Sequence, residues 1–203
     1  MLATDLSNQE FDELLVSGWR RFGIYFFRPM CESCKACIPI RIPVASFKPS
    51  KSQRRVLKKN TNTKVFFREL SYWDDIYNVY EEHSKRFGQD TSVENFRQTF
   101  FSPAVPAFQT EYYVDEKLAA IGFVDLGIDG ISSVYFVFRE EYSHLSLGTF
   151  GALQEIEIVR NLGMKYYYLG YYLEDNKHMK YKALFKPYQL YDWDRDVWIT
   201  QET

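Results

Sequence analysis

The order of periodic segments in the second half of the chain most constrains its fold. Three runs rich in aromatic and β-branched residues are separated by short turns, which predicts an antiparallel meander of strands at 112–115, 118–125 and 131–138. Apolar residues at helical spacing then predict a helix from Leu147 to Leu162, and an aromatic strand follows at 166–170. Strands that run mainly antiparallel beside helices indicate an α+β fold.

The first half of the chain predicts shorter elements around a distinct amino-terminal region. Ser7 and Glu10 have the spacing of a capping box before a helix that ends near Leu15. The other predicted elements are strands at 23–27, 38–44 and 64–68, a basic helix after Pro49, and helices at 71–87 and 91–100, in which Phe87 and Val93 are expected to be buried. We expect two domains, a cysteine-containing basic region at 1–60 and a larger domain at 61–203.

The loop before the long helix is made of small residues. Ser146-Leu-Gly148-Thr exposes backbone N–H groups at a helix N-terminus. Strands, such a helix and a further strand resemble the core of the N-acetyltransferases, which implies a GNAT-like sheet flanked by helices. Phe150 occupies a position where an acetyltransferase needs a small residue beside the pyrophosphate of coenzyme A. We therefore expect Ser146 and Gly148 to orient another phosphate or a carbonyl, the alternative being a capped core helix.

Charge is distributed unevenly, although the formal net charge is only −2. Residues 20–59 contain eleven Lys and Arg and a single acid, Glu32. Such a surface neutralises phosphates and releases counterions, which predicts a nucleic-acid contact. The alternative is a solvated basic helix. The side chains that we assign to this contact are Arg54, Arg55, Lys58 and Lys59.

Three cysteines, Cys31, Cys34 and Cys37, stand at two-residue intervals. Thiolates at this spacing can converge on a metal ion, but structural zinc requires four ligands and no fourth is evident in the sequence. The alternative is three small, partly buried loop residues. Their odd number and close spacing do not suit a disulfide framework, and we find no secretory signal or bilayer-length apolar run, so we expect a cytoplasmic protein without a membrane contact.

Tyrosine and lysine residues gather after the last aromatic strand. Tyr171 and Tyr172 end it, and Lys180, Tyr181 and Lys182 follow closely. Strand ends are common locations for binding residues in open sheets, and lysine suits an acidic substrate group. No Ser-His-Asp or Cys-His arrangement is readable in the sequence.

Several short motifs occur in a specific order along the chain. They are Gly18-Trp-Arg-Arg-Phe-Gly23, Phe27-Arg-Pro29, Cys34-x-x-Cys37, Arg41-x-Pro-Val44, Phe47-x-Pro-Ser-x-Ser-Gln-Arg-Arg55, Ser146-Leu-Gly-Thr-Phe150, Tyr168-Leu-Gly-Tyr-Tyr172 and Tyr181-Lys-x-x-Phe-Lys-Pro187. Taken together, they resemble the aminoacyl-tRNA-protein transferases, which include bacterial aspartate/glutamate leucyltransferases and eukaryotic arginyltransferases. The resemblance covers residues 8–199.

This resemblance implies transfer of an amino acid from charged tRNA to the α-amine of proteins that begin with Asp or Glu, a step of an N-degron pathway. Bacterial-type motifs favour Leu over Arg as the transferred residue. The residues that we assign to the catalytic cleft are Tyr171, Tyr172, Tyr181 and Lys182. Those that we assign to substrate binding are Arg41, Arg54, Arg55, Lys58, Lys59, Ser146, Gly148 and Lys180, with Arg41 or Lys180 pairing with the acidic side chain of the acceptor.

The resemblance also implies zinc or an iron–sulfur cluster in relatives, for which this chain offers Cys31, Cys34 and Cys37. The chain departs from the family pattern in two places. Family members usually begin with a further Cys-containing segment, after which this chain starts, and they often have Gly-Cys where this chain has Asp175-Asn176. We therefore expect an amino-terminally short member that needs no cofactor for transfer. Two alternatives stay open: a non-catalytic or divergent tRNA-binding paralogue, and an acetyl-coenzyme A-dependent N-acetyltransferase.

Overall fold

An eight-stranded sheet forms the centre of the computed structural model, which describes residues 1–3, 5–89 and 91–201. The strand order is β10-β9-β3-β8-β7-β6-β5-β4. The strands of this sheet are β3 (Ile38–Pro43), β4 (Lys64–Glu69), β5 (Ala107–Val114), β6 (Lys117–Leu126), β7 (Gly130–Phe138), β8 (Tyr166–Tyr172), β9 (Tyr188–Asp192) and β10 (Val197–Gln201). Among the described strands, every neighbouring pair of the sheet is antiparallel except β7 and β8.

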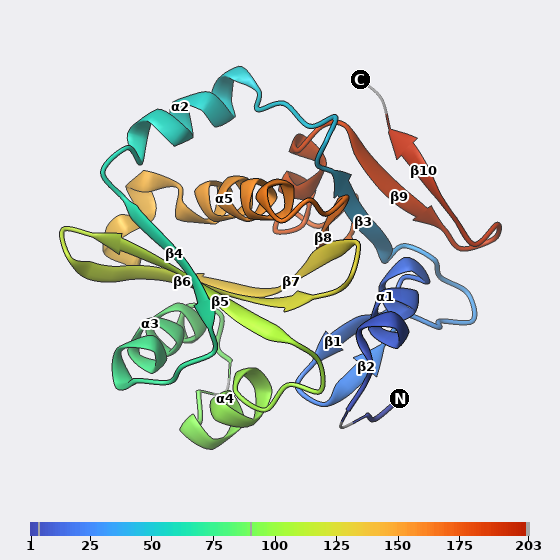
Figure 1. Cartoon of the computed structure of the whole chain (residues 1–203), viewed down its shortest axis with the longest axis horizontal. Helices are drawn as coiled ribbons and strands as arrows, with labels where there is room; N and C mark the ends of the chain where they lie inside the picture. The colour runs from blue at the N-terminus through green and yellow to red at the C-terminus, as the bar shows by residue number, and fades with distance from the viewer. Residues whose placement is uncertain (4, 90, 202–203) are drawn as a thin grey trace.

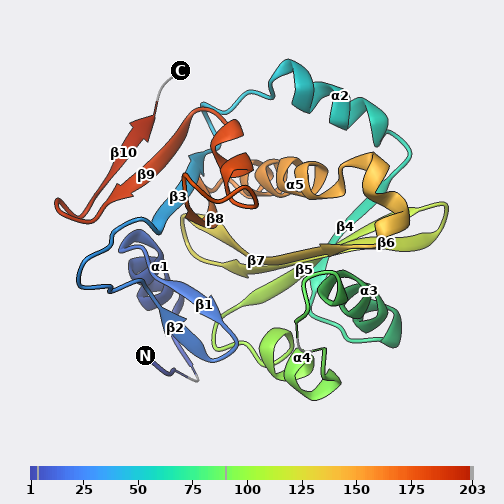
Figure 2. The ribbon, with the colours of Figure 1, turned by 180° about the vertical axis from the view of Figure 1, so that it is seen from behind.

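Helices cover both faces of this sheet (Figures 1 and 2). Helices α2 (Lys51–Lys59) and α5 (Leu147–Asn161) lie on one face, and α3 (Asp74–Lys85) and α4 (Val93–Phe100) lie on the other. The second face also carries α1 (Asn8–Val16) and a hairpin of β1 (Arg20–Phe22) and β2 (Tyr25–Phe27). The expected α+β fold with a mainly antiparallel, helix-flanked sheet is confirmed. No helix in the described part is long and apolar enough to cross a membrane.

Local sequence signals place most elements correctly. The capping box of Ser7 and Glu10 begins α1, and the meander of β5, β6 and β7 is present. The expected burial of Phe87 and Val93 is wrong, because their side chains are 54% and 42% exposed. Strand β3 comes from the predicted amino-terminal region and pairs with β8 and β9 inside the main sheet. The predicted domain boundary at residue 60 stays a prediction.

The strands β7 and β8 pair over a short distance only. Gly130, Ile131 and Ser132 lie opposite Tyr166, Tyr167 and Tyr168, after which the end of β8 pairs only with β3. Two parallel strands that stop pairing leave backbone groups of both edges facing the space between them. The short 3₁₀ helix η1 (Glu140–Leu145) follows β7, and a second one, η2 (Lys180–Leu184), follows β8.

A buried carboxyl group fixes α5 to the middle of the sheet. Glu155 is 1% exposed and accepts hydrogen bonds from the hydroxyls of Thr110 in β5, at 2.9 Å, and Tyr167 in β8, at 2.5 Å. Gly122 in β6 makes room for it, since a Cβ there would lie 2.5 Å from the Glu155 Oε1 atom. Burial raises the pKa of Glu155 to about 7, although hydrogen bonds from Tyr167, Thr110 and Ser133 act in the opposite direction.

This raised pKa predicts a pH dependence of stability. The folded protein retains the Glu155 proton to higher pH than the unfolded chain does, so this group's contribution falls as pH rises from about 5 to 8, on the order of 2 to 3 kcal/mol. Glu155→Gln removes that loss. Urea unfolding of the wild type and the variant at several pH values measures the difference between their free energies of unfolding. His83, whose pKa burial lowers to about 4, contributes equally to both proteins and cancels in this difference. A pH-independent difference would contradict the prediction.

A second buried interaction fixes the β1–β2 hairpin to the sheet. Arg21 in β1 donates from Nε and Nη2 to the carboxylate of Asp125 in β6 at 2.8 and 2.6 Å, and both side chains are almost fully buried. Its Nη1 donates to the carbonyl of Gly23 in the hairpin turn. The pair therefore neutralises two charges that could not be buried singly.

Loss of one partner should be costly. Asp125→Asn leaves the Arg21 guanidinium buried without a counter-charge, and we expect the free energy of unfolding to fall by about 3 to 5 kcal/mol. Lys64→Met breaks the exposed Lys64–Glu116 pair instead and should cost less than about 1 kcal/mol. Chemical denaturation of the two variants measures both values. Equal losses in the two variants would show that the buried pair stabilises the protein no more than the exposed pair does.

Candidate active site

A cavity of about 670 Å³ lies beside the part of β7 that no longer pairs with β8. Its walls come from four segments that are distant in the sequence: the end of α3, the second half of β7, the first turn of α5, and residues 178–181 around the start of η2. The exposed Phe87 belongs to this lining, which explains why its helical spacing did not lead to burial. The cavity therefore brings together His83 from the first half of the chain and Ser146, His178 and Tyr181 from the second half.

The edge of β7 presents backbone groups to this cavity. The N–H of Arg139 donates to Ala119 in β6, so alternation turns the backbone of Phe138 toward the opening. There the Phe138 N–H meets His83 Nδ1 at 3.4 Å and its carbonyl accepts from Arg86 Nη2 at 2.7 Å. The same alternation turns the backbone of Phe136, a lining residue, toward the cavity.

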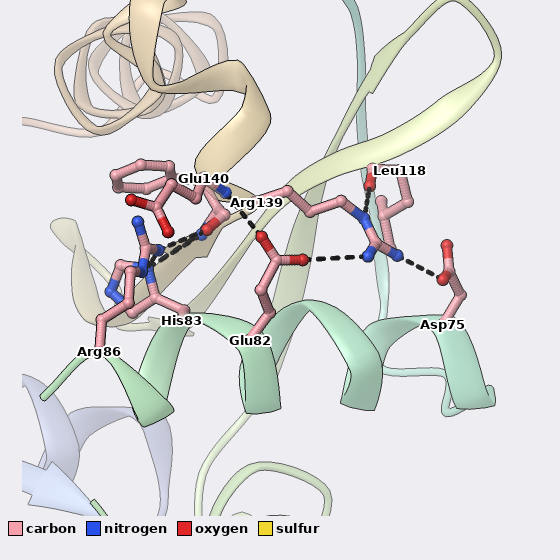
Figure 3. A network of polar contacts seen from close by, with 8 residues as sticks. Asp75, Glu82, His83, Arg86, Leu118, Arg139 and Glu140 are labelled. Carbon is pink, nitrogen blue, oxygen red and sulfur yellow. Dashed lines mark hydrogen bonds and ion pairs between the residues drawn. The ribbon is translucent and has the colours of Figure 1, made fainter. Parts of the chain in front are cut away.

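Polar contacts hold α3 against this end of β7 (Figure 3). Arg139 bridges Asp75 at 2.5 Å and Glu82 at 3.3 Å, and the backbone N–H of Glu140 donates to Glu82 at 2.7 Å. Burial, and then the charge of Arg86, lower the pKa of His83 to about 4, so its imidazole is neutral at pH 7. These contacts position this wall of the cavity, and its histidine acts as a hydrogen-bonding group without charge.

The N-terminus of α5 opens into the cavity. Ser146, at the junction of η1 and α5, has φ 57°, and no side chain of the described residues caps the first turn. A Cβ added to Gly148 would meet none of the described atoms within 4 Å. Phe150 is 3% exposed and packs on Tyr112 at 5.9 Å, so it does not block this helix end, and the expectation that its bulk would hinder coenzyme A there is wrong. The helix dipole and free N–H groups favour a negative ligand atom here.

The basic helix α2 is tied to η2 and to η1, the segment that precedes the first turn of α5. Near its start, Gln53 donates to the carbonyl of Leu184 in η2 at 3.1 Å. At its end, Asn60 donates to Leu145 and Lys59 to His144, both in η1. The predicted nucleic-acid residues of this helix, Arg54, Arg55, Lys58 and Lys59, are all exposed. A polyanion bound on α2 would therefore lie beside the segments that line the cavity.

Only one of the four predicted catalytic side chains lines the cavity. Tyr181 does so together with the predicted substrate residues Ser146 and Gly148. The hydroxyl of Tyr171 instead donates to backbone carbonyls of the hairpin region, and burial raises its pKa to about 12. Tyr172 packs against the hydrophobic core. Lys182 donates to the carbonyl of Tyr171 at the rim of the opening.

The two residues predicted to bind an acidic side chain are placed outside the cavity. Arg41 is 7% exposed, donates from Nε to Gln189 at 2.7 Å, and stacks between Tyr166 and Trp198. Lys180 is exposed at the start of η2. Their predicted roles are not tested by this geometry, but neither side chain faces the space where a substrate would sit.

The three cysteines do not form a metal site in this structure. Cys31 and Cys34 are exposed, and no group of three or more His, Cys, Asp or Glu side chains in the described ranges is arranged to hold a metal ion. Burial, followed by the neighbouring thiols Cys34 and Cys31, raises the pKa of Cys37, which disfavours the thiolate that a metal would bind. Zinc or iron–sulfur binding at this loop stays a prediction from the sequence.

Sequence reasoning did not assign the cavity residues of α3 and β7 to the site. His83 lies within an expected helix, and Tyr135, Phe136 and Phe138 lie within an expected strand of the meander. The signal in the sequence is weak, because alternating aromatic residues in a strand are usually explained by core packing. The early end of the β7–β8 pairing, which exposes them, depends on tertiary structure.

Comparison with known proteins identifies the relationship. The models for "Arginine-tRNA-protein transferase, N terminus" and "C terminus" match residues 1–55 and 73–192. An aspartate/glutamate leucyltransferase of Campylobacter jejuni is 34% identical over 187 residues, which cover 88% of this chain and 78% of the relative.

Two solved structures show the fold alone. FemX is 10% identical with a TM-score of 0.57, over 87% of this chain and 64% of FemX. A tandem GNAT protein from the clavulanic acid biosynthesis pathway is 15% identical with a TM-score of 0.53, over 90% of this chain and 56% of that protein. The expected GNAT-like fold is confirmed. By the match of both family models and of the leucyltransferase sequence, the chain belongs to the arginine-tRNA-protein transferase family.

Proposed function

We propose that this protein transfers leucine from charged tRNA to the α-amine of proteins that begin with Asp or Glu. The observation that carries the proposal is the cavity between β7 and β8, which is joined through η1 and η2 to the exposed basic helix α2. The family and the name of the relative supply the reaction class. The proposal places the reaction in the cytoplasm, where thiols such as those of Cys31 and Cys34 stay reduced.

The chemistry of the cavity suits a leucyl group better than an arginyl group. Phe136, Phe138 and Met179 supply apolar surface, and the described lining contains no Asp or Glu. A leucine side chain gains from such burial. An arginine guanidinium would lose its hydration here without gaining a carboxylate partner, which is costly. This supports leucine as the residue transferred.

The tRNA acceptor arm fits the surface of α2, and its aminoacylated end fits the cavity. Arg54, Arg55 and Lys58 neutralise phosphates, and the free N–H groups at the start of α5 face the same cavity that would contain the ester. Preorganised N–H donors of this kind stabilise the oxygen on which negative charge develops during acyl transfer. We assign the ester carbonyl oxygen to this helix end or to the backbone N–H of Phe136.

Transfer requires little activation of the nucleophile. An α-amine has a pKa of about 7.7 to 8.0, so a useful fraction is neutral at pH 7. Its nitrogen attacks the ester carbonyl, the C–N bond forms, the C–O bond breaks, and the terminal hydroxyl of tRNA leaves with a proton from the amine. Burial raises the pKa of Tyr181, so its hydroxyl stays protonated and can relay that proton. Orientation of the amine and the ester can lower the activation free energy by on the order of 7 to 11 kcal/mol.

The proposal is tested by a transfer assay with six combinations of donor and acceptor. Purified protein is given tRNA charged with radiolabelled leucine or arginine, and peptides that begin with Asp, Glu or Ala. We expect leucine to be incorporated into the Asp and Glu peptides only. Arginine incorporation would reject the donor assignment, and equal labelling of the Ala peptide would reject the acceptor assignment. No labelling would favour a non-catalytic tRNA-binding paralogue.

The role of α2 predicts a specific change in salt dependence. Arg55→Ala with Lys58→Ala removes two exposed charges, so the KM for leucyl-tRNA should rise roughly tenfold or more at low salt, and the slope of log KM against log salt should decrease by about two. The kcat should be little affected. Lys64→Ala with Lys117→Ala removes two exposed charges elsewhere and serves as the control. An unchanged slope in the α2 variant would exclude this helix as the tRNA surface.

A further inference from the structure

A buried cation, Arg20, and a half-buried one, Lys182, lie at the end of β8 without an acidic partner among the described residues. Arg20 in β1 reaches the carbonyl of Gly170 through a long contact of 3.5 Å, and Lys182 in η2 donates to the next carbonyl, that of Tyr171, at 2.7 Å. Both carbonyls belong to the part of β8 that no longer pairs with β7. The two side chains therefore approach the same strand end from the hairpin and from η2.

These charges are not compensated within the protein. Neither Arg20 nor Lys182 forms an ion pair with any described carboxylate, and the buried Arg20 Nε has no hydrogen-bond partner there. Arg20 is only 5% exposed and faces the rings of Tyr168 and Tyr171 at 5.2 and 5.8 Å. Burial, and then the charge of Arg20, lower the pKa of Lys182 to about 8. Burial lowers the pKa of Arg20 to about 10, although Tyr171 and Tyr168 act in the opposite direction. Buried charges are ordinarily paired, so this pair lacks an anion.

We propose that Lys182, with Arg20 behind it, binds the side-chain carboxylate of the acceptor's first residue. Lys182 is half-buried and directly follows Tyr181, which lines the reaction cavity. Gly170, with φ 83°, lies beside its ammonium, since a Cβ there would be 3.6 Å from Nζ. The inference rests on the proposed function and names the residues that make it selective for Asp and Glu.

The position of Arg20 indicates which substrate the pair meets. Arg20 belongs to the hairpin that lies with α3 and α4 on the face of the sheet opposite α2 and α5 (Figures 1 and 2). A tRNA bound on α2 approaches the opening from the other face. The acceptor peptide then enters from the hairpin face, where its carboxylate can neutralise the pair while its α-amine points toward Tyr181. Arg41 is less suited, because its Nε donates to Gln189 and its guanidinium is enclosed by rings.

The test is a binding measurement on the full chain without tRNA. Fluorescence anisotropy is recorded with labelled peptides that begin with Asp, Glu, Asn or Gln, for the wild type, Lys182→Met, Lys182→Arg and the distant control Lys117→Met. We expect the wild type and the control to prefer the acidic peptides. Lys182→Met should weaken acidic peptides about ten- to a hundredfold and leave the amides unchanged, whereas Lys182→Arg should retain the preference. Thermal denaturation confirms that each variant is folded.

If Lys182→Met does not fold, nitrogen NMR of labelled lysine on the wild type replaces it. The Lys182 Nζ resonance should shift with the Asp peptide and not with the Asn peptide. A wild type without acidic preference, equal weakening of acids and amides, or weakened leucyl-tRNA binding in place of peptide binding would overturn the inference. Failure of leucine transfer alongside a Lys182-dependent acidic preference would instead reject the proposed function alone.

Discussion

The short pairing between β7 and β8 is the constraint on which the rest of the structure depends. Hydrogen bonding between these two strands covers three residues on each, and beyond Ser132 and Tyr168 their edges face an opening. The cavity, the free start of α5 and the cations at the end of β8 all belong to that opening. A sheet that paired along its full length would have no place for an ester and an amine to meet.

Buried polar groups keep the opening from closing. Glu155 joins α5 to β5 and β8 from within the core, and Arg21 with Asp125 holds the hairpin against β6. On the other side, Arg139 bridges Asp75 and Glu82 to position α3 at the end of β7. Each of these contacts satisfies a charge or a carboxyl group that would be costly if left alone. Together these contacts fix the positions of the elements around the cavity.

The sequence predicts elements well and their assembly less well. A capping box predicts α1, helical spacing predicts α5, and the ordered motifs identify the family, because these depend on local patterns. The placement of Tyr171 against the hairpin, and of Phe87 and Phe138 in the cavity, depends on contacts between segments far apart in the chain. Charge neutralisation is equally non-local: Arg20 looked like one more basic residue of a positive window until its lack of a carboxylate neighbour could be seen.

The attachment of α2 at both ends has a mechanical consequence. Gln53 joins its first turn to η2, and Asn60 joins its end to η1. The helix therefore connects the segment that carries Tyr181 with the segment that precedes Ser146. A displacement of α2 would therefore act on both segments through these hydrogen bonds. Docking of a large polyanion on its outer side would thereby stiffen the spacing of Tyr181 and Ser146, and one substrate would help to set the dimensions of the chamber in which the other reacts.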